Sequence, residues 1–364
     1  MHSGKGVSVL VQWICQMSLT AGKHYPGSYA EMLAWFPTDA ACLDYLDWLR
    51  WSDGFVCPSC ASVQSWRLPD GRRSCGGCRR RVSATAGTIF HGTRTPLTIW
   101  FAAAWFITTQ KDGASALGLK RVLGLGSYGT AWTMLHRYRT AMVRPSRERL
   151  RGNVEVDETF IGGPEPGKRG RGAGGKVMVA IAVEIEHPTG FGRCRMQVIP
   201  NALGVTLGSF IRDNVELGSV VMTDGLVSYP KALGTDYTHK VFNIAASGNQ
   251  AHVDLPGVHR VASLTKRWIL STYQGSVQPV HLQAYLDEFC FRFNRRNSRK
   301  RGMLFYRLLE QSVVSPPVTE QVLLKRSKPK SRPTTPPSIK RVHAVTLDIK
   351  VKSKPWRRAA PVTG

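Results

Sequence analysis

The sequence predicts a multidomain protein in which a small cysteine-rich module, a helical module and an α/β domain follow one another and precede a basic tail. Three observations lead to this prediction. The chain has 364 residues, and roughly 150 residues per domain allow two to three domains. Four of the eight cysteines form two CxxC pairs in the N-terminal part. The apolar pattern changes from a helical period to a period of two after the basic segment 144–151.

The charge balance indicates a polyanionic partner. Lys and Arg together number 50 and Asp and Glu 24, which gives a formal net charge of +26 and a pI near 10.2. Such an excess favours nucleic acid over a generic basic surface, because each phosphate that a basic side chain neutralises releases condensed counterions. Hydrophobic residues make up 42% of the chain, which excludes a wholly disordered protein.

The sequence predicts no membrane segment. The longest apolar run, 97–108, is well short of the roughly 20 residues that span a bilayer. The apolar stretch 7–17 has no small-residue cleavage pattern, so we do not expect a signal peptide. We therefore expect a cytoplasmic protein with reduced cysteines.

The first two modules are predicted from spacing. Residues 1–51 are expected to form a helical lead-in, with helical apolar spacing over 29–51 that Pro37 interrupts. Residues 52–92 form a short segment that is rich in Gly and Cys. Their cysteines follow the pattern C-x2-C-x14-C-x2-C. These cysteines are Cys57, Cys60, Cys75 and Cys78.

Four thiolates in two tight turns can close a tetrahedral Zn²⁺ shell with no open position, so we predict a structural zinc ribbon. Two redox CxxC pairs are the alternative, but no thioredoxin-like βαβ pattern surrounds them. Several arginines of the ribbon could contact DNA phosphates or simply form a solvated basic face. The arginines proposed for DNA contact are Arg72, Arg73, Arg79 and Arg80.

Residues 96–142 read as helix, helix, glycine turn and helix, which predicts a helix-turn-helix-like module. The last helix has Arg137 and Arg139 among its polar positions, as a helix that enters the major groove would. A helical connector whose polar face meets water is the alternative. The ribbon and the charge of the chain favour DNA.

An α/β domain is predicted over 152–310. Its order is three strands, a helix and a further strand, followed by two helices. The strands are expected at 154–161, 176–185, 193–199 and 219–223, and the helices at 205–215, 258–270 and 279–294. The final segment, 325–364, has twelve Lys or Arg, six Pro and one acidic residue. It is predicted to be a disordered basic tail.

Two acidic residues of the α/β domain are candidates for metal binding. Asp157 lies near the centre of the first strand, and Asp224 ends a buried strand, where open α/β sheets build their sites. Carboxylates that only cap a turn or pair with a base are the alternative. In the helix 258–270, His259 and Lys266 differ by about 20° around the axis, so one face could present a metal ligand and a phosphate-binding cation. A solvated or structural His is the alternative here.

Several motifs carry a resemblance to a known family. In chain order they are FVCPSC, CGGC, GNVEVDETFIGG, VMTDGLVSY, LPGVHRVASLTKRW and HLQAYLDEFCFRFNRR. With them the chain resembles the zinc-ribbon-bearing insertion-sequence transposases of the ISXO-like group, over about residues 29–307. The resemblance implies a ribonuclease-H-like fold for 152–310, with a DDE-type metal triad.

Carried over residue by residue, the resemblance implies that Asp157 and Asp224 are the first two catalytic ligands. The third position varies in the family among Glu, Asn and His. Where it is Glu, it precedes a Lys by seven residues, which here gives His259 before Lys266. Where it is Asn, the matching residue here is Leu264, which cannot bind metal. We therefore predict a DDH variant, with Lys266 and the adjacent Arg267 on DNA.

The function that the resemblance implies is DNA transposition. Two Mg²⁺ or Mn²⁺ ions would support strand cleavage at the ends of an insertion sequence and strand transfer into target DNA. Expected partners are double-stranded DNA, both terminal inverted repeats and target, and further copies of the chain on that DNA, at the bacterial nucleoid. The alternatives are a catalytically inactive DNA-binding protein, decayed or recruited, and a metal-dependent nuclease that does not join strands.

Overall fold

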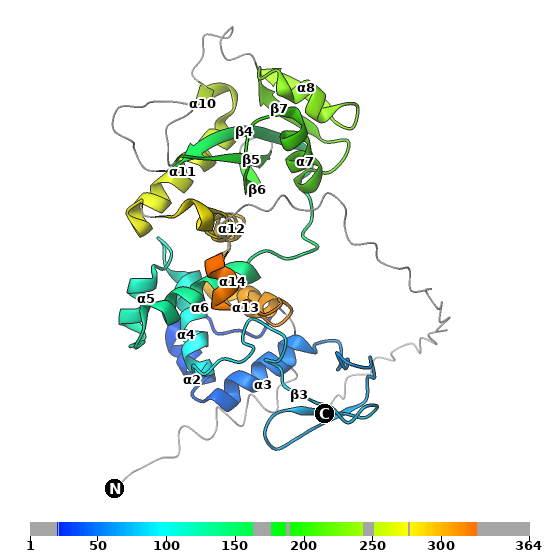
Figure 1. The fold of residues 1–364 in the computed structure, drawn as a ribbon, viewed down its shortest axis with the longest axis vertical. Helices are drawn as coiled ribbons and strands as arrows, with labels where there is room; N and C mark the ends of the chain where they lie inside the picture. Colours follow the sequence, from blue (N-terminus) through cyan, green and yellow to red (C-terminus); the bar gives the residue numbers. More distant parts are fainter. Residues whose placement is uncertain are drawn as a thin grey trace, which may run out of the picture. The chain divides into compact units, whose positions relative to one another are not determined.

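The structure is a computed structural model, and it describes residues 20, 22–162, 176–186, 190–242, 251–275 and 277–325 (Figure 1). The predicted basic tail 325–364 lies outside the described residues except for its first residue. No described helix is both long and apolar enough to cross a membrane.

A helical core is built mainly from the N-terminal part of the chain. Its helices are α2 (Tyr29–Trp35), α3 (Asp39–Arg50), α4 (Leu97–Thr109), α5 (Ala116–Val122) and α6 (Tyr128–Ala141). Side chains of Ser28, Thr38, Ser115 and Ser127 accept a backbone N–H at the starts of α2, α3, α5 and α6, as helix N-caps do. Pro37 separates α2 from α3, and the predicted helices of 96–142 are confirmed.

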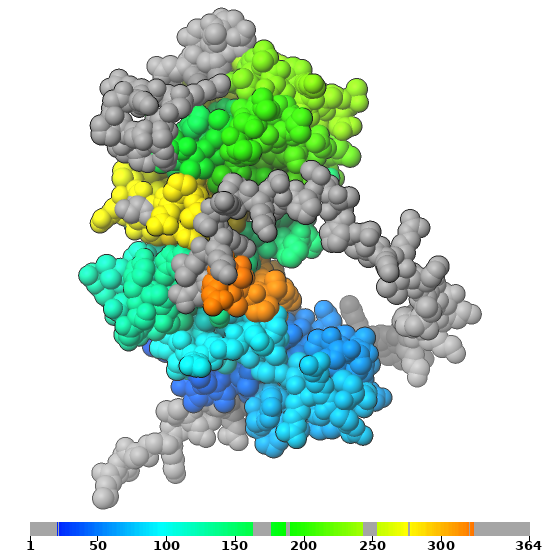
Figure 2. All heavy atoms as spheres, viewed as in Figure 1, coloured from blue at the N-terminus to red at the C-terminus, as the bar shows by residue number. Residues whose placement is uncertain are grey.

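The apolar run that forms α4 is the centre of this core, since nearly all of the helix is buried. A late helix, α13 (Arg301–Ser312), packs against it and against α3 and α6. Phe305 of α13 contacts Phe101 of α4, with ring centroids 5.9 Å apart. Figure 2 shows the orange α13 and α14 (Glu320–Lys325) segments against the cyan N-terminal helices. The segment 301–310, expected within the α/β domain, thus packs in the helical core.

The cysteine-rich module is a three-stranded antiparallel sheet, with β1 (Ser65–Arg67), β2 (Arg73–Cys75) and β3 (Arg81–Val82). Its own apolar core consists of Phe55, Cys57, Cys75 and Val82. So small a core cannot stabilise a domain alone. The module is attached to α3 by Arg50, which donates to three carbonyl oxygens of the segment 83–86.

The α/β domain contains a five-stranded mixed sheet in the order β6-β5-β4-β7-β8. The strands are β4 (Asn153–Ile161), β5 (Val177–Ile185), β6 (Phe191–Val198), β7 (Val220–Asp224) and β8 (Thr238–Phe242). β4, β5 and β6 pair antiparallel, whereas β7 is parallel to β4 and to β8. The four predicted strands are confirmed within one or two residues at their ends, and β8 is additional.

Two helical layers cover this sheet (Figure 1). On one face α7 (Gly204–Asn214) and α8 (Ser228–Leu233) pack on Val154 and Val156 of β4. On the other face lie α10 (Ala251–Asp254), α11 (Pro256–Tyr273), the 3₁₀ turn η1 (Pro279–His281) and α12 (Leu282–Phe293). Successive side chains of β4 therefore point toward opposite faces of the sheet, and each face is covered by its own apolar layer.

Candidate active site and nucleic-acid interface

The two predicted aspartates lie on adjacent parallel strands. The β4–β7 register pairs Glu155 with Met222, and two further residues along each strand lead to Asp157 and Asp224. Side chains of a strand alternate between faces. Because Val154 and Val156 face α7 and α8, Asp157 projects toward the face that α11 covers.

Helix α11 is fixed on this face by Glu155, whose role the sequence analysis did not identify. Its carboxylate accepts the N–H of Val258 at 2.9 Å and also bonds the N–H of Gly257. Both N–H groups belong to the first turn of α11, whose amides have no partner within the helix. A Cβ at Gly257 would lie 2.9 Å from the Glu155 carboxylate, so the close approach requires glycine. Glu155 is only 2% exposed, and burial raises its pKa to about 6.

This anchor brings His259, one residue after Val258, to Asp157. The Nε2 atom of His259 lies 3.9 Å from Oδ2 of Asp157. That nitrogen is buried and has no hydrogen-bond partner, although buried polar atoms normally have one. Ligand atoms of one Mg²⁺, each about 2.1 Å from it, are at most about 4.2 Å apart. The pair therefore fits a divalent cation in both distance and donor chemistry.

The electrostatics of Asp157 link it to the other predicted residues. Burial raises the pKa of Asp157, and the nearby carboxylate of Asp224 adds to the increase. The N–H of Glu158, His259 and Lys266 act in the opposite direction. A buried carboxylate beside a second one is an environment in which a cation is favourable.

Asp224 does not lie as close to Asp157 and His259 as these two lie to each other. Its Oδ1 accepts the N–H of Leu226 at 3.1 Å, as in the turn-capping alternative. Among the described residues, the four ribbon cysteines form the one group of three or more His, Cys, Asp or Glu whose ligand atoms all lie within 4.8 Å of one another. Asp157 and His259 therefore lie within ligand distance of each other. The Asp224 carboxylate lies more than 4.8 Å from the ligand atom of at least one of them.

Three other residues of α11 that the sequence singled out differ in their exposure and packing. Lys266 and Arg267 are exposed, so both can reach a phosphate. Burial of part of its side chain lowers the pKa of Lys266, and the Asp157 carboxylate opposes this. Leu264 instead packs against the apolar layer formed by α11 and α12.

The ribbon cysteines form a compact cluster. Sγ of Cys57 lies 3.7 Å from that of Cys78, and Sγ of Cys60 lies 3.5 Å from that of Cys75. Zn–S bonds of about 2.3 Å in a tetrahedron place sulfurs about 3.8 Å apart, so the cluster fits a structural Zn²⁺. The backbone N–H of Cys78 contributes most to a lower pKa of Cys75, which falls to about 6; this favours the thiolate that binds metal.

The ribbon arginines divide into two groups. Arg79 and Arg80 are exposed, and Arg79 also lies over the exposed ring of Trp66 at 5.3 Å. Arg73 instead makes a bidentate pair with Asp47 of α3, at 3.0 and 2.6 Å. Arg72 pairs with Asp70 in its own hairpin. The predicted DNA contact of Arg73 is corrected by this pairing, because its guanidinium docks the ribbon on α3.

The predicted DNA contacts of the last helix are also corrected. Arg139 is 1% exposed and donates to the fully buried Glu288 of α12 at 2.8 Å, so the prediction that it contacts DNA is wrong. Arg137 donates to the carbonyl oxygens of Ile89 and Val318. Helical spacing identified these polar positions, but α12 and neighbouring loops cover them.

Comparisons with known proteins agree with this arrangement. Residues 37–81 match a transposase zinc-ribbon domain, and residues 149–294 match an ISXO2-like transposase domain. A protein of Halobacterium salinarum, described as an uncharacterized protein in transposable element ISH50, is 27% identical over 291 residues, which cover 73% of this chain and 94% of that protein. The chain therefore has the domain architecture of an ISXO2-like transposase, with a zinc ribbon followed by a DDE-type transposase domain.

Proposed function

We propose that the chain cleaves DNA strands at the ends of an insertion sequence and transfers them into target DNA. The observation that carries the proposal is the pair of Asp157 and His259, 3.9 Å apart, with an unpartnered imidazole nitrogen inside a matched transposase domain. Together with Asp224, they would hold Mg²⁺ or Mn²⁺ as a DDH triad. Bound there, such ions supply Lewis-acid activation of the attacking hydroxyl and of the scissile phosphate.

Side chains of the protein would position the metal ligands and bind the DNA phosphates. Glu155 fixes the first turn of α11 and thereby the position of the His259 side chain. Lys266 would bind a phosphate near the scissile bond as a point charge, and Arg267 beside it would add a second contact. The sheet between two helical layers supports a ribonuclease-H-like domain as the rigid frame for these groups.

DNA recognition would involve the ribbon. The exposed Arg79 and Arg80 would contact backbone phosphates, and Trp66 would add an aromatic surface. The exposed Tyr128 lies at the start of α6, where recognition helices contact bases. We expect the ligands to be terminal inverted repeats and target DNA, bound by several copies of the chain in the bacterial cytoplasm, at the nucleoid.

A catalytically inactive DNA-binding protein is the second candidate. One observation favours it, namely that the Asp224 carboxylate bonds the N–H of Leu226 and does not join the close pair. Such a protein would keep the ribbon and the charge but would lack metal-supported chemistry.

The test is strand cleavage and joining on the DNA that flanks the gene, in Mg²⁺ and in Mn²⁺. Wild type is compared with Asp157→Ala, His259→Ala and the control Asp213→Ala, which removes an exposed carboxylate from α7. We expect the wild type and Asp213→Ala to cut and join. The two site variants should bind DNA as tightly as the wild type but do neither.

A wild type that binds DNA and never reacts in either ion would favour the inactive protein. Cutting without joining would favour a nuclease. Equal activity of His259→Ala and wild type would remove His259 from the proposed triad.

A further inference from the structure

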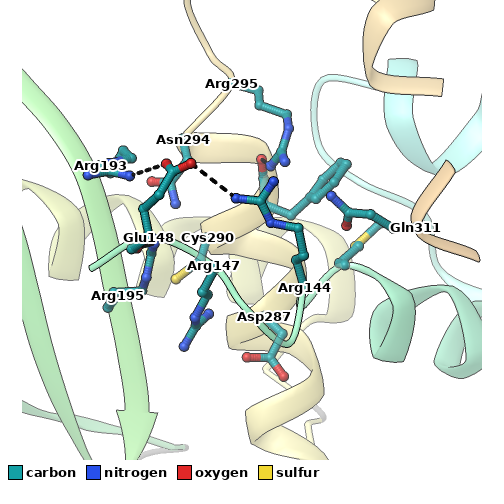
Figure 3. A pocket seen from close by; sticks show the side chains of 12 residues that line it. Arg144, Arg147, Glu148, Arg193, Arg195, Asp287, Cys290, Asn294, Arg295 and Gln311 are labelled. Atoms are coloured by element: carbon teal, nitrogen blue, oxygen red, sulfur yellow. Dashed lines mark hydrogen bonds and ion pairs between the residues drawn. The ribbon is translucent and has the colours of Figure 1, made fainter. Parts of the chain in front are cut away.

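A pocket of about 240 Å³ lies away from the aspartates, at the β6 edge of the sheet. It is enclosed by the segment that joins α6 to β4, by β6, by α12 and by α13 (Figure 3). Two acidic residues, Glu148 and Asp287, are among the residues that line it. The basic lining residues are Arg144, Arg147, Arg193, Arg195 and Arg295. This lining has more cations than anions.

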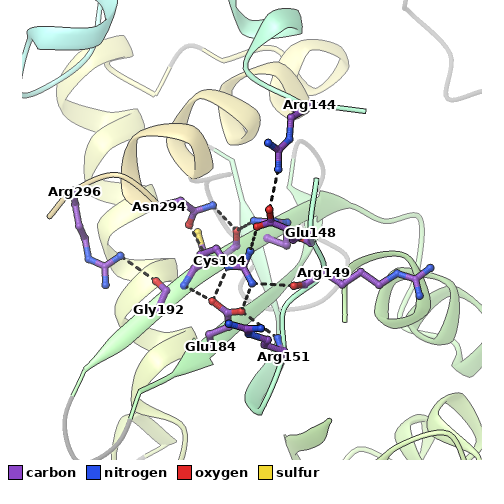
Figure 4. Close-up of polar contacts among 11 residues, drawn as sticks. Arg144, Glu148, Arg149, Arg151, Glu184, Gly192, Cys194, Asn294 and Arg296 are labelled. Atoms are coloured by element: carbon purple, nitrogen blue, oxygen red, sulfur yellow. Dashed lines mark hydrogen bonds and ion pairs between the residues drawn. The ribbon is translucent and has the colours of Figure 1, made fainter. Parts of the chain in front are cut away.

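Two of these arginines are neutralised by carboxylates. Arg193 donates to Glu184 at 2.7 Å and to Glu148 at 3.0 Å, and Arg144 lies 3.3 Å from Glu148. Figure 4 shows this network, in which Glu184 also accepts the N–H of Arg151. Glu148 is therefore shared between two guanidinium groups.

The other three arginines donate hydrogen bonds to neutral acceptors. Arg147 donates to the amide oxygen of Asn214, and Arg195 to the carbonyl oxygens of Cys194 and Glu148. Arg295 donates to the carbonyl oxygen of Phe291. Within the described part of the chain, no salt bridge involves any of these three.

Burial removes water from two of these three arginines. Arg195 is 5% exposed, and burial together with the charge of Arg147 lowers its pKa. Burial lowers the pKa of Arg295 to about 10, with neighbouring arginines contributing. Several guanidinium groups that repel one another in a partly buried space are stabilised when an anion binds among them.

Two further features bear on the occupant of the pocket. The buried Oε1 of Gln311, in the pocket wall, has no hydrogen-bond partner, and as an acceptor it would take a hydrogen bond from a water molecule that accompanies the anion. Arg149 and Arg151 are exposed and follow the pocket residues Arg147 and Glu148 along the chain. Exposed basic residues next to a basic pocket suit a repeating polyanion better than a single small ion.

We propose that this pocket binds a backbone phosphate of DNA, at a site separate from the catalytic triad. The proposal rests on the DNA-binding function proposed above. A water molecule occupies about 30 Å³ in the liquid, so the pocket has room for a phosphate and its ester oxygens. Arg147 and Arg295 are the donors that a phosphate would engage, since neither forms a salt bridge within the described part of the chain.

The test measures the affinity of the full-length, zinc-loaded protein for duplex DNA by fluorescence anisotropy, without Mg²⁺ or Mn²⁺, over a range of salt concentrations. The variants are Arg147→Gln and Arg295→Gln, with Arg147→Lys as the charge-preserving variant. The control is Arg212→Gln, which removes an exposed arginine from α7. Melting temperatures, with and without inorganic phosphate at matched ionic strength, report folding and phosphate binding.

Each Gln variant should reduce the slope of log affinity against log salt by about 0.9, the effect of one lost phosphate contact. Between 50 and 200 mM salt, the wild type should therefore lose about three- to fourfold more affinity than either Gln variant. Arg147→Lys and Arg212→Gln should keep the wild-type slope. Inorganic phosphate should raise the melting temperature of the wild type more than that of the Gln variants.

Unchanged slopes in folded Gln variants, or an equal change in Arg212→Gln, would overturn the proposal. If phosphate protects the wild type alone while all the slopes stay equal, the pocket takes free phosphate and its assignment to DNA is wrong. A wild type that fails to bind duplex DNA would contradict the proposed function itself. A wild type that binds, with variants of equal slope, would contradict only the pocket.

Discussion

Among single residues, the imidazole of His259 decides whether the site can hold a metal ion. Its Nε2 is buried, unpartnered and 3.9 Å from Asp157. A neutral imidazole differs from a carboxylate in two ways, since it is a softer ligand and brings no negative charge. Hard Mg²⁺ prefers oxygen ligands, whereas an imidazole suits transition metals better.

A carboxylate at this position should shift the metal preference. We expect His259→Glu to lower the ratio of the Mn²⁺-supported to the Mg²⁺-supported cleavage rate, severalfold relative to wild type. Ser271→Glu, which adds a carboxylate to an exposed position three turns along the same helix, is the matched control. An unchanged ratio in His259→Glu, or the same change in Ser271→Glu, would contradict a ligand role.

Glu184 gives a prediction about pH. Its hydrogen bonds to Arg193 hold the pKa of Glu184 below its usual range, against the effect of burial. A lowered native pKa means that the interaction stabilises the fold above the unfolded pKa near 4.5 and is lost as pH falls through the native pKa. Glu184→Gln should therefore cost about 1 to 2 kcal/mol at pH 7.

Urea unfolding of wild type, Glu184→Gln and Glu216→Gln at pH 7 and at pH 3 checks this prediction. The difference between wild type and Glu184→Gln should shrink at the lower pH. Glu216 is exposed, so its variant should match wild type at both. A difference that grows on acidification would refute the assignment.

At the scale of secondary structure elements, a buried ion pair joins α6 to α12. Arg139 and Glu288 are 1% and 0% exposed in their side chains, and the guanidinium lies 4.1 Å from the ring centre of Tyr285. Tyr273 of α11 also accepts from Arg139. The guanidinium of Arg139 in α6 therefore connects the helical module to α11 and α12 of the α/β domain.

Replacing one partner of this pair should lower the free energy of unfolding much more than replacing both. Arg139→Met leaves the Glu288 charge buried without its partner, which costs about 3 to 5 kcal/mol. Arg139→Met with Glu288→Leu should recover a large part of that loss. A double-mutant cycle of unfolding free energies measures this, and strictly additive losses would contradict the coupling.

The elements also show what the sequence could and could not predict. The period of two predicted β4, apolar runs predicted β5 and β7, and Asp157 and Asp224 became candidates through their strand positions. Edge strand β8 is half exposed, so it has no apolar run to identify it. The burial of Arg139 and the capping by Glu155 depend on which helix covers which face, and helical spacing does not contain that information.

At the scale of the whole molecule, the ribbon is the part that depends most on a ligand. Its apolar core has four residues, of which two are cysteines. The pair between Arg73 and Asp47 attaches it to α3. A Zn²⁺ bound by the four cysteines would therefore supply much of the free energy that keeps the ribbon folded.

Removal of zinc should unfold the ribbon and leave the α/β domain folded. After chelation, amides of β1 and β2 should exchange rapidly with solvent, while those of β4 and β5 stay protected. Affinity for DNA should fall at least tenfold, and Cys60→Ser should behave similarly. Hydrogen exchange and anisotropy measure both effects. Retained protection in β1 and β2 would show that the ribbon does not need its metal.

Electron paramagnetic resonance can count the Mn²⁺ ions that the zinc-loaded full chain binds, and this number tests the proposed metal site without relying on catalysis. We expect binding in the wild type and in Asp213→Ala, with at least one site lost in both Asp157→Ala and His259→Ala. Equal Mn²⁺ binding by all four folded proteins would contradict this expectation, because Asp157 and His259 would then not form a metal site.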